Sequence, residues 1–370
     1  MKPIKVCHLT SVHYWSDTRI LHRECASLAR KGLEVHLVVA NQEVESFPNV
    51  HIHAVQAPAR TRMQRMWSVT SAVYRKALEI DAALYHFHDP ELMPVGRRLQ
   101  KQGKKVIFDV HEHVPNQILT KPYLPAFLRP VVAGLYDRYE KYMAAKMDGI
   151  VTAVDTVRDR LAPYNTFTID INNYPEQGLL YVENDWSKKK RDVCYVGLIN
   201  EIRGIGEMLD ALVEPGDWRL TLVGYFDTPE LEARMRAHPG WARVDFAGRQ
   251  SRKAVAQFLA ESKIGIVTFL PAPNHNKNQP NKLFEYMAAG IPVVCSHFSR
   301  WEKIIEGAGC GVCVDPASPP AIAKAVEQLL AQPEKARQMG MKGRKAMESE
   351  YNWEREEEKL WDFYQKVLEK

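Results

Sequence analysis

Short apolar runs alternate with amphipathic segments along most of the chain, and this alternation restricts its possible folds more than any other feature. The first series of runs covers residues 6–10, 35–40, 50–55, 83–88, 105–110, 149–154 and 166–171, with helical stretches such as 19–31 between them. Apolar runs of this kind, separated by helices, predict parallel strands in a doubly wound sheet. The chain is therefore expected to be an α/β protein.

The alternation breaks in a polar segment that begins near Asn172 and ends near Arg191, where we expect a linker. A second series follows over residues 193–197, 220–224, 244–248, 264–269, 291–295 and 311–314. Two sheets in 370 residues predict two domains. We place them at 1–175 and 176–350, and expect the helix within 351–370 to cross back to the first domain, because its apolar stripe must pack on something.

Composition excludes several classes of protein. A net charge of +5 is mild for this length and argues against a nucleic-acid binder, but it suits an anionic small substrate or an anionic membrane surface. There is no apolar run of about 20 residues and no signal-peptide pattern, so a cytoplasmic location is expected, including the inner face of a membrane. The six cysteines predict no disulfide framework, and Cys310–Cys313 is interpreted as a short buried strand.

Glycines at strand ends and a helix start after Pro280 predict an anion site in the second domain. Four of the six runs there have a glycine at one end, and a glycine at a strand end lets a phosphate approach the backbone. Pro280 suits a helix opening with Asn281 as its cap, leaving N–H groups free for an anion. Glu285, one turn in, can accept hydrogen bonds from a ribose diol, although the helix dipole alone would also favour it.

The segment from Pro280 to Val294 resembles the donor-binding signature of the retaining GT-B glycosyltransferases of family 4, and the resemblance spans nearly the whole chain. It implies the GT-B fold, with two Rossmann-like domains facing across a cleft. It also implies transfer of a sugar from a UDP- or GDP-linked donor to a glycan or lipid-linked acceptor, as in surface polysaccharide or glycoconjugate synthesis. The proposed family mechanism uses no enzymic nucleophile, and we expect neither a metal nor another cofactor.

On the donor side, Tyr195–Ile205 resembles the family's first strand and loop, where a basic residue before glycine clamps the diphosphate. Arg203 takes that place, and Lys282 supplies a second charge; a solvated Arg203 paired with Glu201 is the alternative. Residues 246–250 resemble the segment beside the nucleobase. The expected donor-binding residues are Gly197, Arg203, Gly248, Arg249, Asn281, Lys282, Leu283, Phe284 and Glu285.

In the first domain, residues 106–113 resemble the strand end where the family places a histidine near the transferred sugar, which makes His111 a catalytic candidate with Arg203 and Lys282. The histidines at 86, 88, 111 and 113 also permit a metal site, which we do not expect. Asp17 and Asp89 are interpreted as helix caps. The residues that could instead face the acceptor or the sugar are Asp17, Arg19, His88, Asp89 and His275.

The sequence departs from the family pattern at two places. Lys277 stands where many members have a glutamate eight residues before Glu285, so the donor sugar stays open, and the first loop lacks adjacent glycines. Residues 60–67 and 123–129 mix basic and apolar side chains, as at a membrane contact or on a partly buried helix. A nucleotide-sugar epimerase and a catalytically decayed sugar-nucleotide or glycan-binding protein are the alternative functions.

Overall fold

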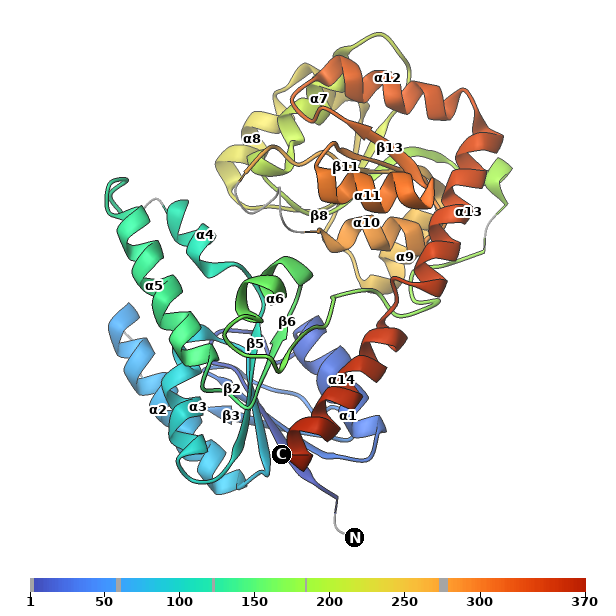
Figure 1. Cartoon of the computed structure of the whole chain (residues 1–370). Coiled ribbons are helices and arrows are strands. Elements are labelled where there is room, and N and C mark those ends of the chain that lie inside the picture. The colour runs from blue at the N-terminus through green and yellow to red at the C-terminus, as the bar shows by residue number, and fades with distance from the viewer. Residues whose placement is uncertain (1–2, 58–60, 122–123, 184, 273–278) are drawn as a thin grey trace. The chain divides into compact units, whose positions relative to one another are not determined.

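The computed structural model describes residues 3–57, 61–121, 124–183, 185–272 and 279–370. The chain folds into two compact units: residues 1–173 with 355–370 form unit 1, and residues 174–354 form unit 2. The chain thus leaves unit 1 just before Tyr174 and returns to it at Arg355 (Figure 1). These positions lie within a few residues of the domain limits expected from the sequence.

Unit 1 contains a parallel sheet with the order β3-β2-β1-β4-β5-β6-β7. Its strands are β1 Lys5–Leu9, β2 Glu34–Ala40, β3 Val50–Val55, β4 Leu84–Phe87, β5 Lys105–Val110, β6 Gly149–Thr152 and β7 Thr168–Asp170. The strand order reverses direction between β1 and β4. In an open α/β sheet this switch point is where the loops diverge and ligands bind.

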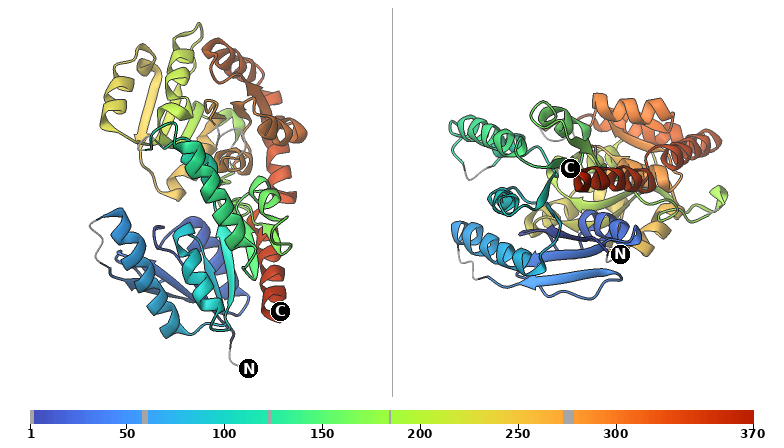
Figure 2. Two further views of the ribbon diagram at one scale, coloured as in Figure 1. Left: turned by 60° about the vertical axis from the view of Figure 1, so that its left-hand side comes forward. Right: turned by 60° about the horizontal axis from the view of Figure 1, so that its bottom comes forward.

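Helices cover both faces of this sheet, as the views in Figure 2 show. They are η1 Thr18–Cys25, α1 Ala26–Arg30, α2 Arg62–Ile80, η2 Pro90–Leu92, α3 Met93–Gln100, α4 Val114–Leu119, α5 Arg129–Ala144, α6 Asp155–Leu161 and the last helix, α14 Trp353–Glu369. The helix predicted over 19–31 begins with π-helical geometry in η1. π-helical turns are rare and often occur at functional sites.

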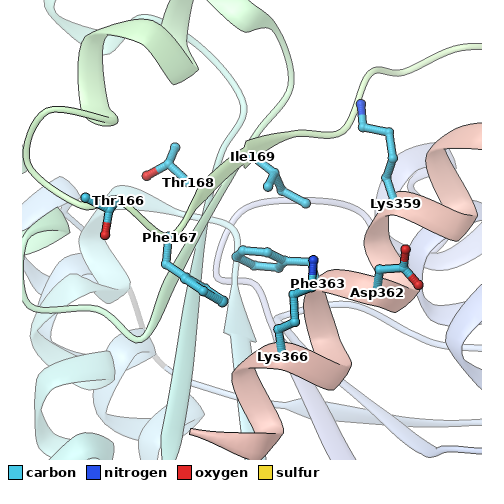
Figure 3. Close-up of a pocket in the computed structure, with 8 residues that line it drawn as sticks. All are labelled: Thr166, Phe167, Thr168, Ile169, Lys359, Asp362, Phe363 and Lys366. Atoms are coloured by element: carbon cyan, nitrogen blue, oxygen red, sulfur yellow. The ribbon is translucent and has the colours of Figure 1, made fainter.

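The apolar stripe of α14 packs on unit 1. The Tyr364 hydroxyl lies 2.7 Å from His86 Nδ1 and 3.1 Å from His8 Nε2, and all three side chains are buried. The Phe363 ring fills the space beside Gly149, where a Cβ atom would lie 2.6 Å from it. A shallow hollow of about 280 Å³ remains between the β7 region and α14, lined in part by Phe167 and Phe363 (Figure 3).

Unit 2 contains a parallel sheet with the order β10-β9-β8-β11-β12-β13. Its strands are β8 Arg191–Ile199, β9 Leu220–Phe226, β10 Val244–Gly248, β11 Ser262–Val267, β12 Val293–Ser296 and β13 Gly311–Val314. Its helices are η3 Trp186–Lys188, η4 Glu201–Arg203, α7 Ile205–Val213, α8 Pro229–Arg236, η5 Pro239–Arg243, α9 Arg252–Glu261, α10 Asn281–Ala288, α11 Ser299–Ala308, α12 Pro319–Leu330 and α13 Pro333–Ser349. The switch point lies between β8 and β11.

The two series of strands predicted from the sequence are confirmed, and so are the two parallel α/β sheets. All six cysteines are free, and β13 is the short strand expected beside Cys310. Within the described ranges, no helix is both long enough and apolar enough to cross a membrane.

Candidate functional site

The candidate donor site lies at the switch point of unit 2, where the loop after β8 meets the end of β11. The Asn200 side chain accepts a hydrogen bond from the Arg203 amide over 3.1 Å, which closes the η4 turn. Gly204 follows with φ +76°, and a Cβ atom there would lie 2.1 Å from the Thr268 carbonyl oxygen. Only glycine permits this approach, so the turn that carries Arg203 packs directly on the backbone that follows β11.

Two cationic side chains gather over Gly197 at the end of β8. A Cβ atom on Gly197 would lie 2.8 Å from Lys282 Nζ and 3.9 Å from Arg203 Nη1, so both groups border the space that this glycine leaves open. Arg203 Nη1 donates to the Leu198 carbonyl over 3.1 Å. Burial, with the Arg203 charge nearby, lowers the pKa of Lys282 to about 8, and the Glu285 carboxylate opposes this shift.

Neither cation is neutralised by a salt bridge with a carboxylate in the part of the chain that the structure describes. Glu201, the alternative partner considered for Arg203, pairs with Arg234 instead. Holding two like charges together in a largely buried place costs free energy unless an anion joins them. The arrangement therefore fits a multiply charged anion such as a diphosphate.

Helix α10 brings Lys282 and Glu285 to this place. Pro280 has extended geometry and is the N-cap, so Asn281 is the first helical residue and not the cap that we expected from the sequence. The Leu283 and Phe284 side chains are buried in the core of unit 2, which leaves only their backbone groups for a ligand. The predicted helix start is thus off by one residue.

The Glu285 carboxylate has a partner that sequence reasoning missed. Arg252 Nη1, at the start of α9, donates to Glu285 Oε1 over 2.6 Å. Thr268 Oγ1, at the end of β11, is also unexpected, because it is buried without a hydrogen-bond partner among the described residues. The sequence carries no local signal for either residue, since each comes from a different βα unit of the same sheet.

The other donor-side candidates lie farther along the sheet or outside the described residues. Gly248 ends β10 with φ +67°, two strands away from β8. The exposed Arg249 guanidinium lies over the Tyr225 ring, 5.3 Å from its centroid. His275 and Lys277 fall outside the described residues, so the expected role of His275 near the acceptor or the sugar stays a prediction, and so does the effect of Lys277 in place of the glutamate.

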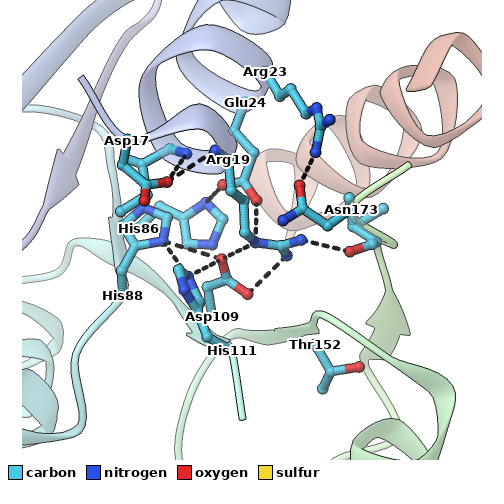
Figure 4. A network of polar contacts seen from close by, with 12 residues as sticks. Asp17, Arg19, Arg23, Glu24, His86, His88, Asp109, His111, Thr152 and Asn173 are labelled. Carbon is cyan, nitrogen blue, oxygen red and sulfur yellow. Dashed lines mark hydrogen bonds and ion pairs between the residues drawn. The ribbon is translucent and has the colours of Figure 1, made fainter. Parts of the chain in front are cut away.

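In unit 1, a buried cluster of histidines and carboxylates occupies the switch point (Figure 4). His88 follows β4, and its ring bonds Asp109 Oδ2 over 3.0 Å and His8 Nδ1 over 2.9 Å. The same Asp109 oxygen lies 2.8 Å from His111 Nε2. His111 is the partly exposed member, so the cluster fixes its ring from the buried side.

Arg19 supplies the charge that balances this cluster. Its guanidinium donates to both Asp109 oxygens over 2.9 and 3.0 Å, and to the Ile171 carbonyl over 2.6 Å. Burial opposes ionisation of Asp109, but the Arg19 and His111 groups hold the pKa of that carboxyl well below its usual range. Burial raises the pKa of the neighbouring Glu24 carboxyl and lowers the pKa of His88 to about 4. Asp109 is therefore the carboxylate whose charged form is favoured, the protonated form of Glu24 is favoured by its burial, and His88 is neutral at pH 7.

This burial corrects the expectation that Arg19, His88 and Asp89 face an acceptor, because all three are buried and have partners inside unit 1. Asp89 occupies the N-cap position of η2, as the sequence predicts, but its side chain makes no capping hydrogen bond. Its Oδ2 accepts hydrogen bonds from Thr10 Oγ1 over 2.7 Å and from the Ser11 amide over 2.6 Å, because β1 and β4 are neighbours.

Asp17, in contrast, is the cap that the sequence predicts, and it accepts hydrogen bonds from the Arg19 and Ile20 amides over 2.8 and 3.0 Å. His13, which the sequence analysis did not single out, lies beside it. Although burial opposes the shift, Asp17 and Asp89 raise the pKa of His13. The His13 and His111 rings are 4.8 Å apart, so these two rings and Asp17 form the partly exposed edge of the cluster.

Two groups in unit 1 have the composition of metal ligands: His8, Glu24, His86 and His88 form one, and His88, Asp109 and His111 form the other. Several of their histidine nitrogens hydrogen-bond one another, Asp109 or Tyr364, whereas both Glu24 oxygens and His86 Nε2 are buried without a hydrogen-bond partner among the described residues. The Arg19 guanidinium also lies 3.0 Å from Glu24 and would repel a second cation. The Arg19 charge beside Glu24 therefore disfavours a metal ion in the first group, and the bonds of Asp109 to Arg19, His88 and His111 disfavour one in the second.

Comparison with known proteins agrees with this geometry. Residues 181–346 match the family described as Glycosyl transferases group 1, and residues 18–167 match the Glycosyl transferase 4-like domain. Spore coat protein SA of Bacillus subtilis (strain 168) is 32% identical over 189 residues, which is 48% of this chain and 49% of that protein. The match therefore spans about half the length of that relative.

Solved structures share the whole fold, and two of them serve as examples. Sucrose-phosphate synthase from Thermosynechococcus elongatus has a TM-score of 0.78 at 18% identity, over 98% of this chain and 99% of its own. HepE of Anabaena, in complex with UDP-glucose, has a TM-score of 0.74 at 13% identity, over 98% of this chain and 100% of its own.

The two α/β units and the cationic switch point of unit 2 thus define a glycosyltransferase with the GT-B fold. This chain belongs to the family 4 type of these enzymes, the glycosyl transferases group 1.

Proposed function

We propose that the protein transfers a sugar from a nucleotide-diphosphate sugar to a glycan or a lipid-linked acceptor, with retention of the anomeric configuration. The observation that carries the proposal is the pair of cations, Arg203 and Lys282, held over Gly197 without a carboxylate partner among the described residues. A diphosphate supplies the negative charge that this place lacks. A role in surface polysaccharide or glycoconjugate synthesis, and a cytoplasmic location, are parts of the same proposal.

The two cations then act mainly on the leaving group. As the bond between the sugar and the diphosphate breaks, negative charge grows on the diphosphate oxygens, and fixed cations stabilise that charge more than they stabilise the ground state. The acceptor hydroxyl gives its proton to the departing diphosphate, so no enzymic nucleophile takes part. Because Arg203 and Lys282 supply the positive charge, we propose that the reaction needs no metal ion.

In unit 1, His111 is proposed to hold a sugar hydroxyl. Its Nε2 lies 2.8 Å from Asp109 Oδ2, so this nitrogen carries the proton and donates to the carboxylate. The other ring nitrogen, Nδ1, is then an acceptor for a hydroxyl group. Asp109, fixed by Arg19, acts through His111 as a positioning residue.

UDP is the proposed nucleotide, with GDP as the alternative. The support is that HepE of Anabaena, which has the same fold, is solved with UDP and with UDP-glucose. Glu285 is proposed to hold the ribose diol in exchange for its bond to Arg252. The sugar itself stays open, because Lys277 replaces the glutamate that many family members have near it.

A thermal-shift screen with UDP, UDP-glucose, UDP-N-acetylglucosamine and GDP-mannose tests this proposal. A ligand that binds the native state raises the melting temperature, and we expect the rise to be lost in Arg203→Ala and Glu285→Ala. Glu230→Ala, a change at an exposed glutamate of unit 2, is the control and should keep it. Equal shifts in the wild type and in Arg203→Ala would contradict the assigned site.

The reaction is then followed by NMR with the donor that binds. Transfer to an acceptor with the anomeric configuration of the donor supports the proposal, and an EDTA-treated enzyme should keep its rate. An isomerised sugar from the donor alone would indicate an epimerase. Binding without transfer to any of a panel of acceptors would indicate a binding protein.

A further inference from the structure

The solvent-facing side of helix α5 is apolar, although a surface helix normally turns polar side chains to water. Phe127 and Leu128 precede the helix, and Val131, Leu135 and Tyr142 follow at helical spacing on one side of it. Phe127 is 77% exposed, Leu135 65% and Val131 56%. We call Phe127, Leu128, Val131, Leu135, Tyr139 and Tyr142 the α5 stripe. It extends over about four helical turns.

The acidic residues of α5 are all used inside unit 1. Asp137 pairs with Lys141 over 2.6 Å and with Arg160 over 2.8 Å. Glu140 is buried, contacts Arg160 and accepts a hydrogen bond from Tyr136. No carboxylate of α5 therefore borders the stripe on its exposed side.

Basic side chains are the charged groups beside the stripe. Arg138 is exposed and lies between Leu135 and Tyr142 on the same side of the helix. Lys146 Nζ lies 4.2 Å from the centroid of the Tyr142 ring, just beyond the helix end. Apolar anchors with tyrosines and a basic rim are the pattern of a helix that lies in the interface of an anionic membrane.

The stripe lies along the outside of unit 1. Figure 1 shows α4 beside α5, and only the C-terminal end of α5 reaches the core of unit 1, through Met143 and Ala144. Leu119, at the end of α4, is a further exposed apolar side chain on this pair of helices. We propose that the α5 stripe docks unit 1 on the surface of an anionic lipid membrane, with Phe127, Val131 and Leu135 entering the acyl boundary and Arg138 and Lys146 contacting phosphates.

Charge complementarity favours lipid over a second copy of the chain. In a dimer formed through the stripe, each copy would bring its own Arg138 and Lys146 toward a surface of the same sign. Anionic headgroups neutralise these charges, and the tyrosine hydroxyls can stay at the level of the headgroups. The proposal is independent of the donor site, which lies in unit 2.

The test is flotation of the full chain with vesicles of phosphatidylcholine alone and of phosphatidylcholine with phosphatidylglycerol. The double variant Val131→Asp with Leu135→Asp places charges within the stripe. Its control is Val213→Asp with Leu179→Asp, which adds the same charge at exposed apolar residues of unit 2; Val213 is 57% exposed, closely matching Val131. Both pairs are surface changes, and thermal unfolding with and without UDP checks that the fold and the donor site are intact.

We expect the wild type and the control to float with the anionic vesicles, and binding to fall about tenfold or more in the stripe variant, because two apolar anchors are lost. Added salt should weaken wild-type binding. Equal flotation of the stripe variant and the wild type, or no flotation of the wild type, would overturn the proposal. A wild-type dimer in light scattering that disappears in the stripe variant would also overturn it, in favour of a second copy.

Discussion

The pH dependence of nucleotide binding tests the paired cations in unit 2 without any knowledge of the acceptor. Burial and Arg203 lower the pKa of Lys282 to about 8 in the free protein. At a pKa near 8, about nine tenths of these amines are charged at pH 7 and about one tenth at pH 9. A diphosphate beside the amine favours its charged form and raises its pKa in the complex.

The rise of the Lys282 pKa on binding sets the direction in which UDP affinity changes with pH. Above pH 8 the free protein must take up a proton at Lys282 to bind the anion, so affinity falls as the pH rises. If the pKa in the complex is about 10 or higher, the Kd for UDP increases about tenfold between pH 7 and pH 9, or about 1.4 kcal/mol. The terminal phosphate of UDP contributes little, because its last ionisation is near pH 6 and is about nine tenths complete at pH 7.

Isothermal titration of UDP at pH 7, 8 and 9 measures this change, and Lys282→Arg is the matched control. A guanidinium stays charged throughout this range, so the Kd of the variant should change less than about twofold. Any ionisation of the uracil ring would affect both proteins and cancel in the comparison. The same slope in the wild type and in Lys282→Arg, or no slope in the wild type, would refute the role of the Lys282 charge.

Three further predictions concern stability and are checked by urea unfolding. Gly224→Ala should lower the free energy of unfolding by roughly 3 kcal/mol or more, because its Cβ atom would lie 1.8 Å from a backbone oxygen of β8. The control, Gly206→Ala, lies in a helix with open space around the glycine and should be neutral or slightly stabilising. Equal effects of the two substitutions would contradict the close approach of the strands at Gly224. Arg19→Met should lower the free energy of unfolding by about 3–5 kcal/mol, because it removes the ion-pair partner of the buried Asp109 carboxylate. The control, Arg30→Met, breaks the surface pair with Glu357 and should lower it by less than about 1 kcal/mol. Tyr364→Phe should cost about 1–3 kcal/mol, since buried histidine nitrogens lose their partner, and an unchanged midpoint would mean that this hydroxyl does not hold α14 on unit 1.

Much of the fold could be predicted from the sequence, because both sheets are built from local patterns. Each strand is an apolar run of its own, and the break after Asn172 marks the change of unit within a few residues. The signature around Glu285 also placed helix α10, although its cap is Pro280 and not Asn281.

The parts that could not be predicted depend on contacts between distant segments. Asp89 resembles a helix cap in sequence, but its carboxylate is taken by Thr10 and Ser11 of the neighbouring strand's loop. Arg19 precedes Asp109 by 90 residues, so no local pattern shows that it is buried as the counterion of that carboxylate. Similarly, the Arg252 bond to Glu285 arises only when α9 and α10 pack on the same sheet.

A crystal structure of the protein with UDP tests the proposed donor site most directly. We expect the diphosphate over Gly197, with its oxygens at about 3 Å from the Arg203 guanidinium and the Lys282 ammonium, and the ribose hydroxyls on Glu285. A diphosphate bound elsewhere, with Arg203 and Lys282 still facing an empty space, would contradict it.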